Sequence, residues 1–308
     1  MGPPATIDYA QSATRAPTFA LDGLITSLRP QQWVKNGFVF AALIFSRSIT
    51  DWHRNARVAA GAILFCLISS AVYLLNDILD APEDRKHPLK RLRPLASGRL
   101  GLGTASLAAI VLALASLGGA WVLDHTFFVT AAAYGLINVL YSWALKRVVL
   151  LDVFVLSAGF VLRVISGGVI IHVEISPWLV VCATLLALFL ALSKRRHELV
   201  VLGREAGDHR AILSSYSPYF LDQLIGIVTA STVMSYALYT LSSDVQVKFP
   251  GKRLELTIPF VLFGIFRYLY LMHQNQEGGN PTQLLFADPV LLSVVLFWAA
   301  SVIFIIYL

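Results

Sequence analysis

Long apolar stretches separated by short polar segments run through most of this sequence. An α-helix needs about 17–25 apolar residues to cross the hydrocarbon core of a bilayer, which is ~30 Å thick. Nine such stretches can be placed, at residues 24–46, 57–79, 102–122, 126–145, 150–172, 177–193, 221–242, 256–273 and 288–307. The pattern therefore predicts an all-α, polytopic membrane protein with nine transmembrane helices. The first stretch fits least well, because Arg29, Pro30, Lys35 and Asn36 interrupt it.

The composition supports a membrane protein. Hydrophobic residues make up 57% of the 308 residues and charged residues only 14%, with a mean hydropathy of +0.70. A soluble domain commonly carries about 25% charged residues. Residues 1–20 lack the apolar core of a secretory signal and are expected to form a mobile tail, which leaves residues 21–308 as a single transmembrane domain. Cys66 and Cys182 lie within apolar stretches, where a thiol acts as a small hydrophobic group.

Lys and Arg are distributed unevenly between the two sides of the predicted bundle. Sixteen of them fall on the side of the N-terminus and six on the other side, and Arg163 and Arg267 lie within spans. We expect the protein to lie in the inner (plasma) membrane. The positive-inside rule then places the side that is richer in Lys and Arg in the cytoplasm. Because the basic residues stand between membrane spans, the net charge of +6 indicates phosphate groups at a membrane as partners, and not nucleic acid.

The most polar stretch begins where the second apolar segment ends. Asn76, Asp77, Asp80 and Asp84 carry carboxamide or carboxylate groups, and their spacings place them on one side of a helix. Such oxygen ligands suit Mg²⁺, which usually keeps some waters and takes its remaining ligands from substrate phosphates. The cluster therefore predicts a magnesium site for a diphosphate substrate. The alternative is a solvated acidic helix end followed by a basic loop.

The loop behind this acidic cluster contains His87-Pro88, Arg93-Pro94 and Ser97-Gly98-Arg99. Cluster and loop together resemble the first aspartate-rich motif and the following loop of the UbiA superfamily of intramembrane prenyltransferases. The resemblance extends over nearly the whole chain in span count, motif position and polar loops on one face. It implies a helical bundle around a central polar cavity, with Mg²⁺ bound by the acidic cluster and a lateral opening for a lipid tail.

The first predicted span contains an unusual polar run from Arg29 to Asn36, R-P-Q-Q-W-V-K-N. One interpretation is interfacial anchoring, in which Trp33 sits at the membrane surface and the Lys35 side chain extends toward water. The other is that Lys35 and Asn36 face the polar cavity and bind substrate.

Polar side chains also stand at the start of the fifth span and within it. Tyr141 and Lys146 precede Asp152. One interpretation is an ordinary basic loop in which Asp152 caps the following helix. The other is a binding site in which Tyr141 and Lys146 hold a diphosphate and Asp152 accepts a hydrogen bond from a sugar hydroxyl. UbiA relatives use a Tyr and a Lys at this place for diphosphate. Arg163 lies about 16 Å further along the helix. An arginine at that depth faces water, an anionic substrate or a polar partner on another helix.

The sixth span ends in a run that departs from the family pattern. Typical UbiA prenyltransferases carry a second D-x-x-x-D motif there, whereas this chain has Lys194, Arg195, Arg196, His197 and Glu198. The departure puts a second carboxylate-bound Mg²⁺ in doubt and provides cations for another phosphate. The alternative is a stop-transfer cluster of positive charge.

The R-P-x-Q-W-x-K-N run and the K-R-R-H-E order resemble the decaprenyl-phosphate phosphoribosyltransferase branch of the superfamily. This resemblance implies transfer of 5-phosphoribose from 5-phosphoribosyl 1-diphosphate (PRPP) to decaprenyl or another polyprenyl phosphate, for cell-wall arabinan precursors. One alternative is a UbiA-type aromatic prenyltransferase that uses a polyprenyl diphosphate. A transporter or lipid-binding protein is the non-enzyme alternative, but the sequence has no convincing internal repeat. A homo-oligomer is compatible with the sequence.

Overall fold

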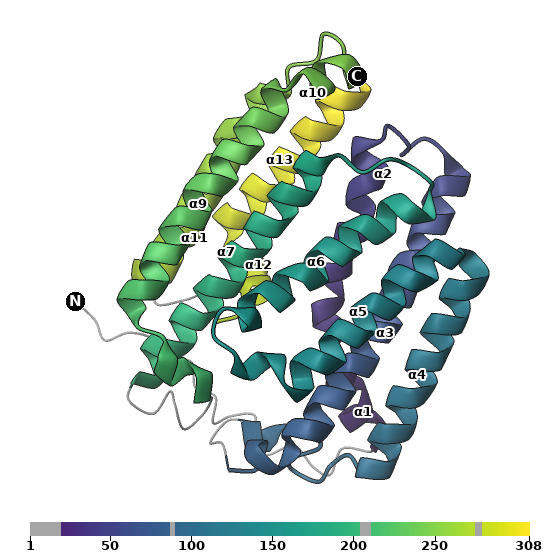
Figure 1. Cartoon of the computed structure of the whole chain (residues 1–308), viewed down its shortest axis with the longest axis vertical. Helices are drawn as coiled ribbons and strands as arrows, with labels where there is room; N and C mark the ends of the chain where they lie inside the picture. Colours follow the sequence, from purple (N-terminus) through teal and green to yellow (C-terminus); the bar gives the residue numbers. More distant parts are fainter. Residues whose placement is uncertain (1–19, 87–89, 204–210, 275–278) are drawn as a thin grey trace.

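The computed structural model describes residues 20–86, 90–203, 211–274 and 279–308, and within these ranges all regular structure is helical (Figure 1). Residues 1–19 of the expected mobile tail and His87-Pro88 lie outside the described residues, and Ala20, the last residue of that tail, begins the first helix. Eight helices are long and apolar enough to cross a membrane. They are α3 (Trp52–Asp84), α4 (Leu102–Leu123), α5 (His125–Trp143), α6 (Leu151–Ile170), α7 (Pro177–Leu202), α9 (Pro218–Leu241), α11 (Ile258–Gln274) together with the short helix before it, and α13 (Pro289–Tyr307).

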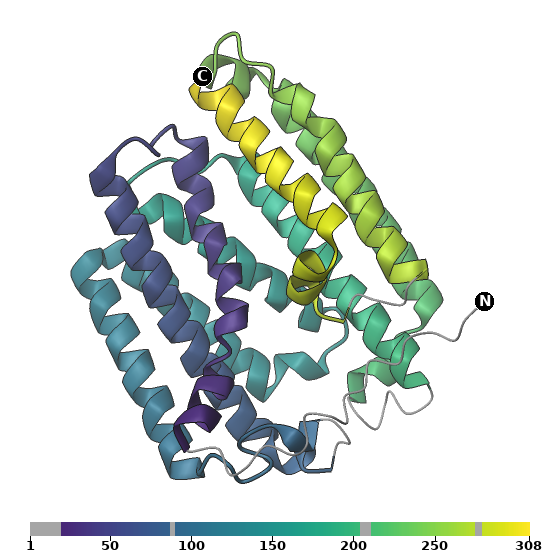
Figure 2. The same cartoon turned by 180° about the vertical axis from the view of Figure 1, so that it is seen from behind.

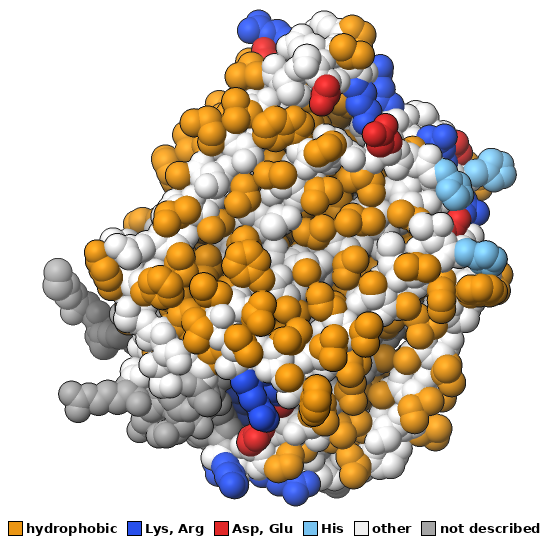
Figure 3. Space-filling view, in the orientation of Figure 1, with side chains coloured by type: hydrophobic (Ala, Val, Ile, Leu, Met, Phe, Trp, Pro, Cys, Tyr) orange, Lys and Arg blue, Asp and Glu red, His pale blue; other side chains and the backbone are white. Residues whose placement is uncertain are grey.

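Shorter helices connect these spans at the two ends of the bundle. They are η3 (Lys90–Leu92), η4 (Leu145–Arg147), η6 (Ala211–Ser215), α10 (Ser243–Lys248), η7 (Leu254–Thr257) and α12 (Pro281–Ala287). Apolar side chains cover the body of the molecule in Figure 3, and most charged side chains on that face lie toward its upper and lower ends. The all-α membrane fold predicted from the apolar pattern is confirmed.

The first predicted span, residues 24–46, is interrupted, so the predicted count of nine spans is approximate. It consists of α1 (Ala20–Leu28), the 3-10 helix η2 (Pro30–Phe40) and α2 (Ala41–Phe45). Between α1 and η2, Arg29 adopts the left-handed conformation, with φ 52° and ψ 58°. A residue before proline avoids the right-handed helical region, and Pro30 has no N–H to continue the α1 hydrogen bonds. The polar residues that weakened the sequence pattern therefore lie in an irregular segment of the bundle.

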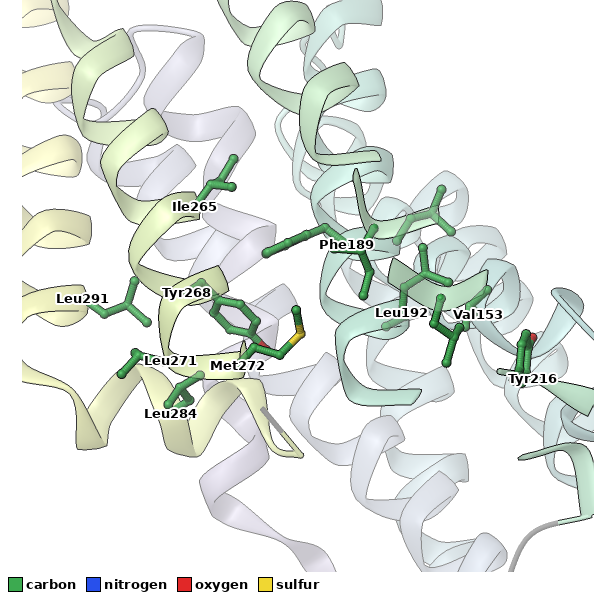
Figure 4. Packing of buried hydrophobic residues seen from close by; sticks show 14 of the residues in the cluster. Val153, Phe189, Leu192, Tyr216, Ile265, Tyr268, Leu271, Met272, Leu284 and Leu291 are labelled. Carbon is green, nitrogen blue, oxygen red and sulfur yellow. The ribbon is translucent and has the colours of Figure 1, made fainter. Parts of the chain in front are cut away.

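Two of the buried apolar clusters position this segment and the helices around it. The first joins η2 and α2 to α3, α5 and α6 through side chains such as Val39, Phe65 and Phe127. The second joins α6, α7, α9, α11 and α13; within it, Phe189 and Tyr268 pack edge to face with ring centroids 5.1 Å apart (Figure 4). Seen from behind, η2 and α2 run beside α3 on the face nearest the viewer (Figure 2).

The backbones of α6 and η2 approach each other closely at Gly167. A Cβ atom at Gly167 would lie 1.9 Å from the carbonyl oxygen of Val39. Because the Val39 carbonyl oxygen belongs to the backbone, it could not rotate away from the added Cβ as a side-chain atom could. This contact holds η2 against α6, and the side chain of Asn36 on η2 accepts a hydrogen bond from Arg163 on α6.

We expect Gly167→Ala to lower the thermal stability of the detergent-purified protein, since overpacking a tight contact costs about 1–3 kcal/mol. Gly118→Ala is the matched control, because a Cβ at Gly118 in α4 meets nothing within 4 Å. That change should leave the melting temperature unchanged or raise it, as alanine favours the helix. Equal melting temperatures for the two variants would contradict the close packing of α6 on η2.

Candidate active site

A cavity of about 1470 Å³ lies inside the bundle, as the family resemblance implied. Polar side chains of η2, α3, α5, η4 and α7 line one part of it, among them Asp80 and Lys146. Apolar side chains of α7, α9, α11 and α13 line another part, including Leu179, Val261 and Trp298. Typical pockets for small ligands measure about 300–1,000 Å³. The cavity therefore has room for a polar and an apolar substrate together.

The last turns of α3 bring Asn76 and Asp80 to the cavity, one helical turn apart. The Asn76 Nδ2 atom donates a hydrogen bond to Asp80 Oδ2 at 3.0 Å, and Lys146 Nζ lies 2.6 Å from Asp80 Oδ1. All three side chains line the cavity. The four-residue spacing read from the sequence thus corresponds to neighbouring groups, and Lys146, far away in the sequence, joins them.

Asp77 and Asp84 point toward a different set of partners. Asp77 is buried between Arg29 and Arg93, and it does not line the cavity. Arg93 Nη1 also lies 2.6 Å from Asp84 Oδ2, and Asp84 does line the cavity. The four polar groups of the acidic cluster therefore do not all face the same space. Sequence reasoning did not assign Arg29 and Arg93 to the site, although buried carboxylates at a membrane span require cationic partners.

The donor set at this end of α3 fits a divalent cation that is shared with a substrate. Among the described residues, no group of three or more His, Cys, Asp or Glu side chains could hold a metal ion by itself. Mg²⁺ commonly needs only one or two protein carboxylates when substrate phosphates complete its coordination. Asn76, Asp80 and Asp84 all line the cavity and supply such oxygens. Metal binding by the acidic cluster remains a prediction.

A buried network surrounds Arg195 on α7. Its Nε atom lies 2.8 Å from Asp152 Oδ2, its Nη1 atom pairs with Glu198, and its Nη2 atom lies 3.4 Å from the Tyr141 hydroxyl. Arg195 is 1% exposed yet lines the cavity, as do Tyr141 and Glu198, whereas Asp152 does not. Asp152 therefore holds the arginine in place. Arg195, Tyr141 and Glu198 are the members of the network that can contact a ligand in the cavity.

Tyr216 completes this network and was not identified from the sequence. Its hydroxyl donates to Asp152 Oδ1 at 2.8 Å and accepts from the Leu150 backbone N–H at 2.8 Å. Burial raises the pKa of Tyr216 to about 12, so the hydroxyl stays protonated and able to donate. Only the three-dimensional structure brings this residue, which follows η6, to the start of α6.

The basic run at the end of α7 divides according to helical position. Lys194 lines the cavity, with its Nζ atom 4.0 Å from Glu198 Oε1. Arg196 does not line it and pairs with Asp222 of α9. His197 packs against Gly279, where an added Cβ would lie 2.5 Å from His197 Cδ2. A helix turns by about 100° per residue, so consecutive basic residues cannot all face one cavity. Among the residues proposed from this run, Arg196 and His197 are not brought to the cavity.

The predicted polar residues of the first span meet Arg163. Its Nε atom donates to Asn36 Oδ1 at 2.8 Å and its Nη2 atom donates to the Tyr134 hydroxyl at 2.8 Å. Lys35 and Arg163 line the cavity, and Tyr134, which the sequence did not single out, lines it with them. Asn36 is buried behind them and orients Arg163.

Comparisons with known proteins identify the relatives of this chain. The profile of the UbiA prenyltransferase family matches residues 37–197. Decaprenyl-phosphate phosphoribosyltransferase of Corynebacterium glutamicum is 32% identical over 292 residues, which cover 93% of this chain and 87% of that protein. The protein of the same name from Mycolicibacterium smegmatis is 31% identical over 306 residues, with 96% of each chain covered.

Solved structures support the fold independently. A UbiA homologue from Archaeoglobus fulgidus bound to GPP and Mg²⁺ aligns with a TM-score of 0.70, covering 93% of this chain and 100% of the homologue. Its sequence is 19% identical, so this likeness concerns the fold alone. Together, the matching profile, the relatives and the shared fold show that this chain belongs to the UbiA prenyltransferase family.

Proposed function

We propose that this protein transfers 5-phosphoribose from PRPP to decaprenyl phosphate or another polyprenyl phosphate and releases diphosphate. The observation that carries the proposal is the strong excess of cations around the cavity. Its lining contains ten Lys and Arg residues and four Asp and Glu residues. The relatives named decaprenyl-phosphate phosphoribosyltransferase, which match nearly the whole chain, support the same activity.

The excess of cations corresponds to the number of phosphate groups that the reaction must hold. A prenyltransferase binds one diphosphate, whereas phosphoribosyl transfer also requires space for the ribose 5-phosphate and the lipid phosphate. Lys194 and Arg195 line the cavity where typical family members are expected to carry carboxylates. Charged N–H donors of this kind form strong hydrogen bonds with phosphate oxygens. The departure from the family pattern therefore favours a phosphate-rich pair of substrates.

The polar end of the cavity would bind the sugar donor. Asn76, Asp80 and Asp84 would hold Mg²⁺ together with the diphosphate of PRPP, and the bound ion would neutralise charge on that leaving group. Lys146 stands beside Asp80 and would donate to the diphosphate, as would the Tyr141 hydroxyl. These side chains are already held in place by hydrogen bonds, which favours a fixed orientation of the leaving group.

The transfer itself exchanges one bond at the anomeric carbon for another. The bond from C1 of ribose to the diphosphate oxygen breaks, and its electron pair leaves with the diphosphate while C1 gains oxocarbenium character. An oxygen of the lipid phosphate then forms the new bond to C1. Because that oxygen is already anionic, the acceptor requires no general base. The prenyl chain would lie along the apolar lining that includes Leu179, Val261 and Trp298.

The purified protein, supplied with Mg²⁺, labelled PRPP and a short polyprenyl phosphate, should form a labelled lipid. Asp80→Asn should lower the rate about 100-fold or more, because loss of a metal-holding group commonly costs several kcal/mol of transition-state stabilisation. EDTA should abolish the reaction. Asp244→Asn, the same chemical change at an exposed site in α10, should leave the rate unchanged.

The competing activity gives a different result in the same assay. The protein could instead consume a prenyl diphosphate, prenylate 4-hydroxybenzoate and leave PRPP untouched. This result would contradict the proposed function and show that the protein is an aromatic prenyltransferase. Full activity of Asp80→Asn in the presence of EDTA would instead show that the acidic cluster is structural.

We further propose that the cavity's polar end faces the cytoplasm of a plasma-membrane protein, where PRPP and Mg²⁺ are supplied and arabinan precursors begin. Single cysteines at the exposed positions Ser97 and Ser243 test this orientation in a background lacking Cys66 and Cys182. A membrane-impermeant maleimide should label Ser243→Cys in intact cells, and Ser97→Cys only after the membrane is opened, since the Lys and Arg excess lies on the side of Ser97. Labelling of both positions from outside would contradict the orientation.

A further inference from the structure

Cations that line the cavity differ in their surroundings. Two of them are matched by carboxylates near the ends of α3 and α7: Lys146 lies 2.6 Å from Asp80, and Arg195 lies 2.8 Å from Asp152. Lys35 of η2 and Arg163, further along α6, also line the cavity. Neither forms a salt bridge with a carboxylate in the part of the chain that the structure describes. The positive charges of Lys35 and Arg163 are therefore not balanced by a carboxylate of the described residues.

Arg163 is held rigidly by neutral groups. Its Nε, Nη1 and Nη2 atoms donate to Asn36 Oδ1, the Gly159 carbonyl and the Tyr134 hydroxyl, each at 2.8 Å. The guanidinium also lies over the rings of Tyr134 and Phe160, 4.6 and 5.4 Å from their centroids. A guanidinium has five N–H donors, so two remain beyond these contacts with described residues. Arg163 therefore lines the cavity as a charge in a fixed position that keeps N–H donors beyond these three bonds.

Lys35 has even fewer interactions of its own. No hydrogen-bond acceptor or anionic partner of its ammonium group occurs among the described residues, and the same cavity is lined by the cations Arg29, Arg163 and Lys194. A cation among cations at membrane depth is costly unless an anion joins it. The arrangement is thus incomplete in the protein alone and is completed by a ligand of negative charge.

We propose that Lys35 and Arg163 form a subsite for a phosphate monoester, separate from the diphosphate site at Asp80 and Lys146, and that the lipid acceptor's phosphate occupies it. The assignment rests on the proposed function. A phosphate monoester carries a charge of about −1.5 to −2 near neutral pH, which two cations balance. Because neither cation has a carboxylate partner, this phosphate is bound by N–H donors directly and not through a shared metal ion.

The position of the subsite favours the lipid over the sugar donor. Arg163 stands about 16 Å along α6 from Asp152, which anchors the polar end of the cavity. Around it, Phe38 and Phe160 line the cavity with ring centroids 5.3 Å apart, and the apolar lining of α7, α11 and α13 continues from there. A phosphate that carries a prenyl chain needs this apolar surface, whereas the ribose 5-phosphate does not.

Binding measurements on the detergent-purified protein test the subsite without relying on turnover. Lys35→Gln should raise the Kd for farnesyl phosphate about tenfold or more, as expected when a charge-assisted hydrogen bond is lost. The Kd for PRPP with Mg²⁺ should change little, and so should the weak binding of farnesol, which lacks the phosphate. Lys35→Gln leaves no described acceptor unpaired, so the fold should persist. Lys252→Gln at the other end of the bundle is the matched control.

Two results would overturn the assignment. A higher Kd for PRPP with unchanged binding of farnesyl phosphate would place the ribose 5-phosphate at Lys35. Unchanged binding of both ligands would show that Lys35 and Arg163 do not form an anion subsite. The proposed function can fail separately: if the wild-type protein transfers no phosphoribose but Lys35→Gln still weakens farnesyl phosphate and not farnesol, the subsite stands without that reaction.

Discussion

Buried carboxylates inside a membrane bundle need cationic partners, and this requirement organises the end of α3 and the segments around it. Asp77 is 3% exposed and lies between Arg29 and Arg93. Removing one member of such a buried pair would leave an uncompensated charge, which commonly costs about 3–5 kcal/mol. Through Arg29 and Arg93, Asp77 fixes the break in the first span and the loop after α3 against the same helix. The ion pairs are therefore structural supports of the cavity as well as neighbours of the substrate.

The interrupted first span follows from the same constraint. A break in a membrane-spanning helix is tolerated where the backbone is buried in protein or lines a cavity. The 3-10 helix η2 lines the cavity through Lys35 and packs against α6 at Gly167. The break between α1 and η2 directs Arg29 toward Asp77, while η2 places Lys35 at the cavity and Asn36 against Arg163. A regular helix through residues 24–46 would give these side chains different directions. The polar residues that disturbed the hydrophobic pattern are the ones that connect the first span to the site.

The fold was largely predictable from the sequence because apolar length is a local property. Eight of the predicted spans correspond to helices long enough to cross a membrane, and the first was already the weakest prediction. Within the site, the spacing of Asn76 and Asp80 correctly placed them side by side, since it depends only on helix geometry. The direction of Asp77 was not predictable in this way, because its partners Arg29 and Arg93 come from other segments. Arg196 shows the same limit, since its partner Asp222 lies on α9.

The proposed chemistry depends most directly on a divalent cation bound jointly by the end of α3 and a substrate diphosphate. Electron paramagnetic resonance with Mn²⁺ in place of Mg²⁺ can detect this arrangement, because phosphorus nuclei coordinated through oxygen couple to the bound ion. With PRPP present, we expect Mn²⁺ bound to the wild-type protein to show phosphorus coupling, and Asp80→Asn to lose both the binding and the coupling. Mn²⁺ that binds equally well to Asp80→Asn, or that shows no phosphorus coupling with PRPP, would contradict the proposed site.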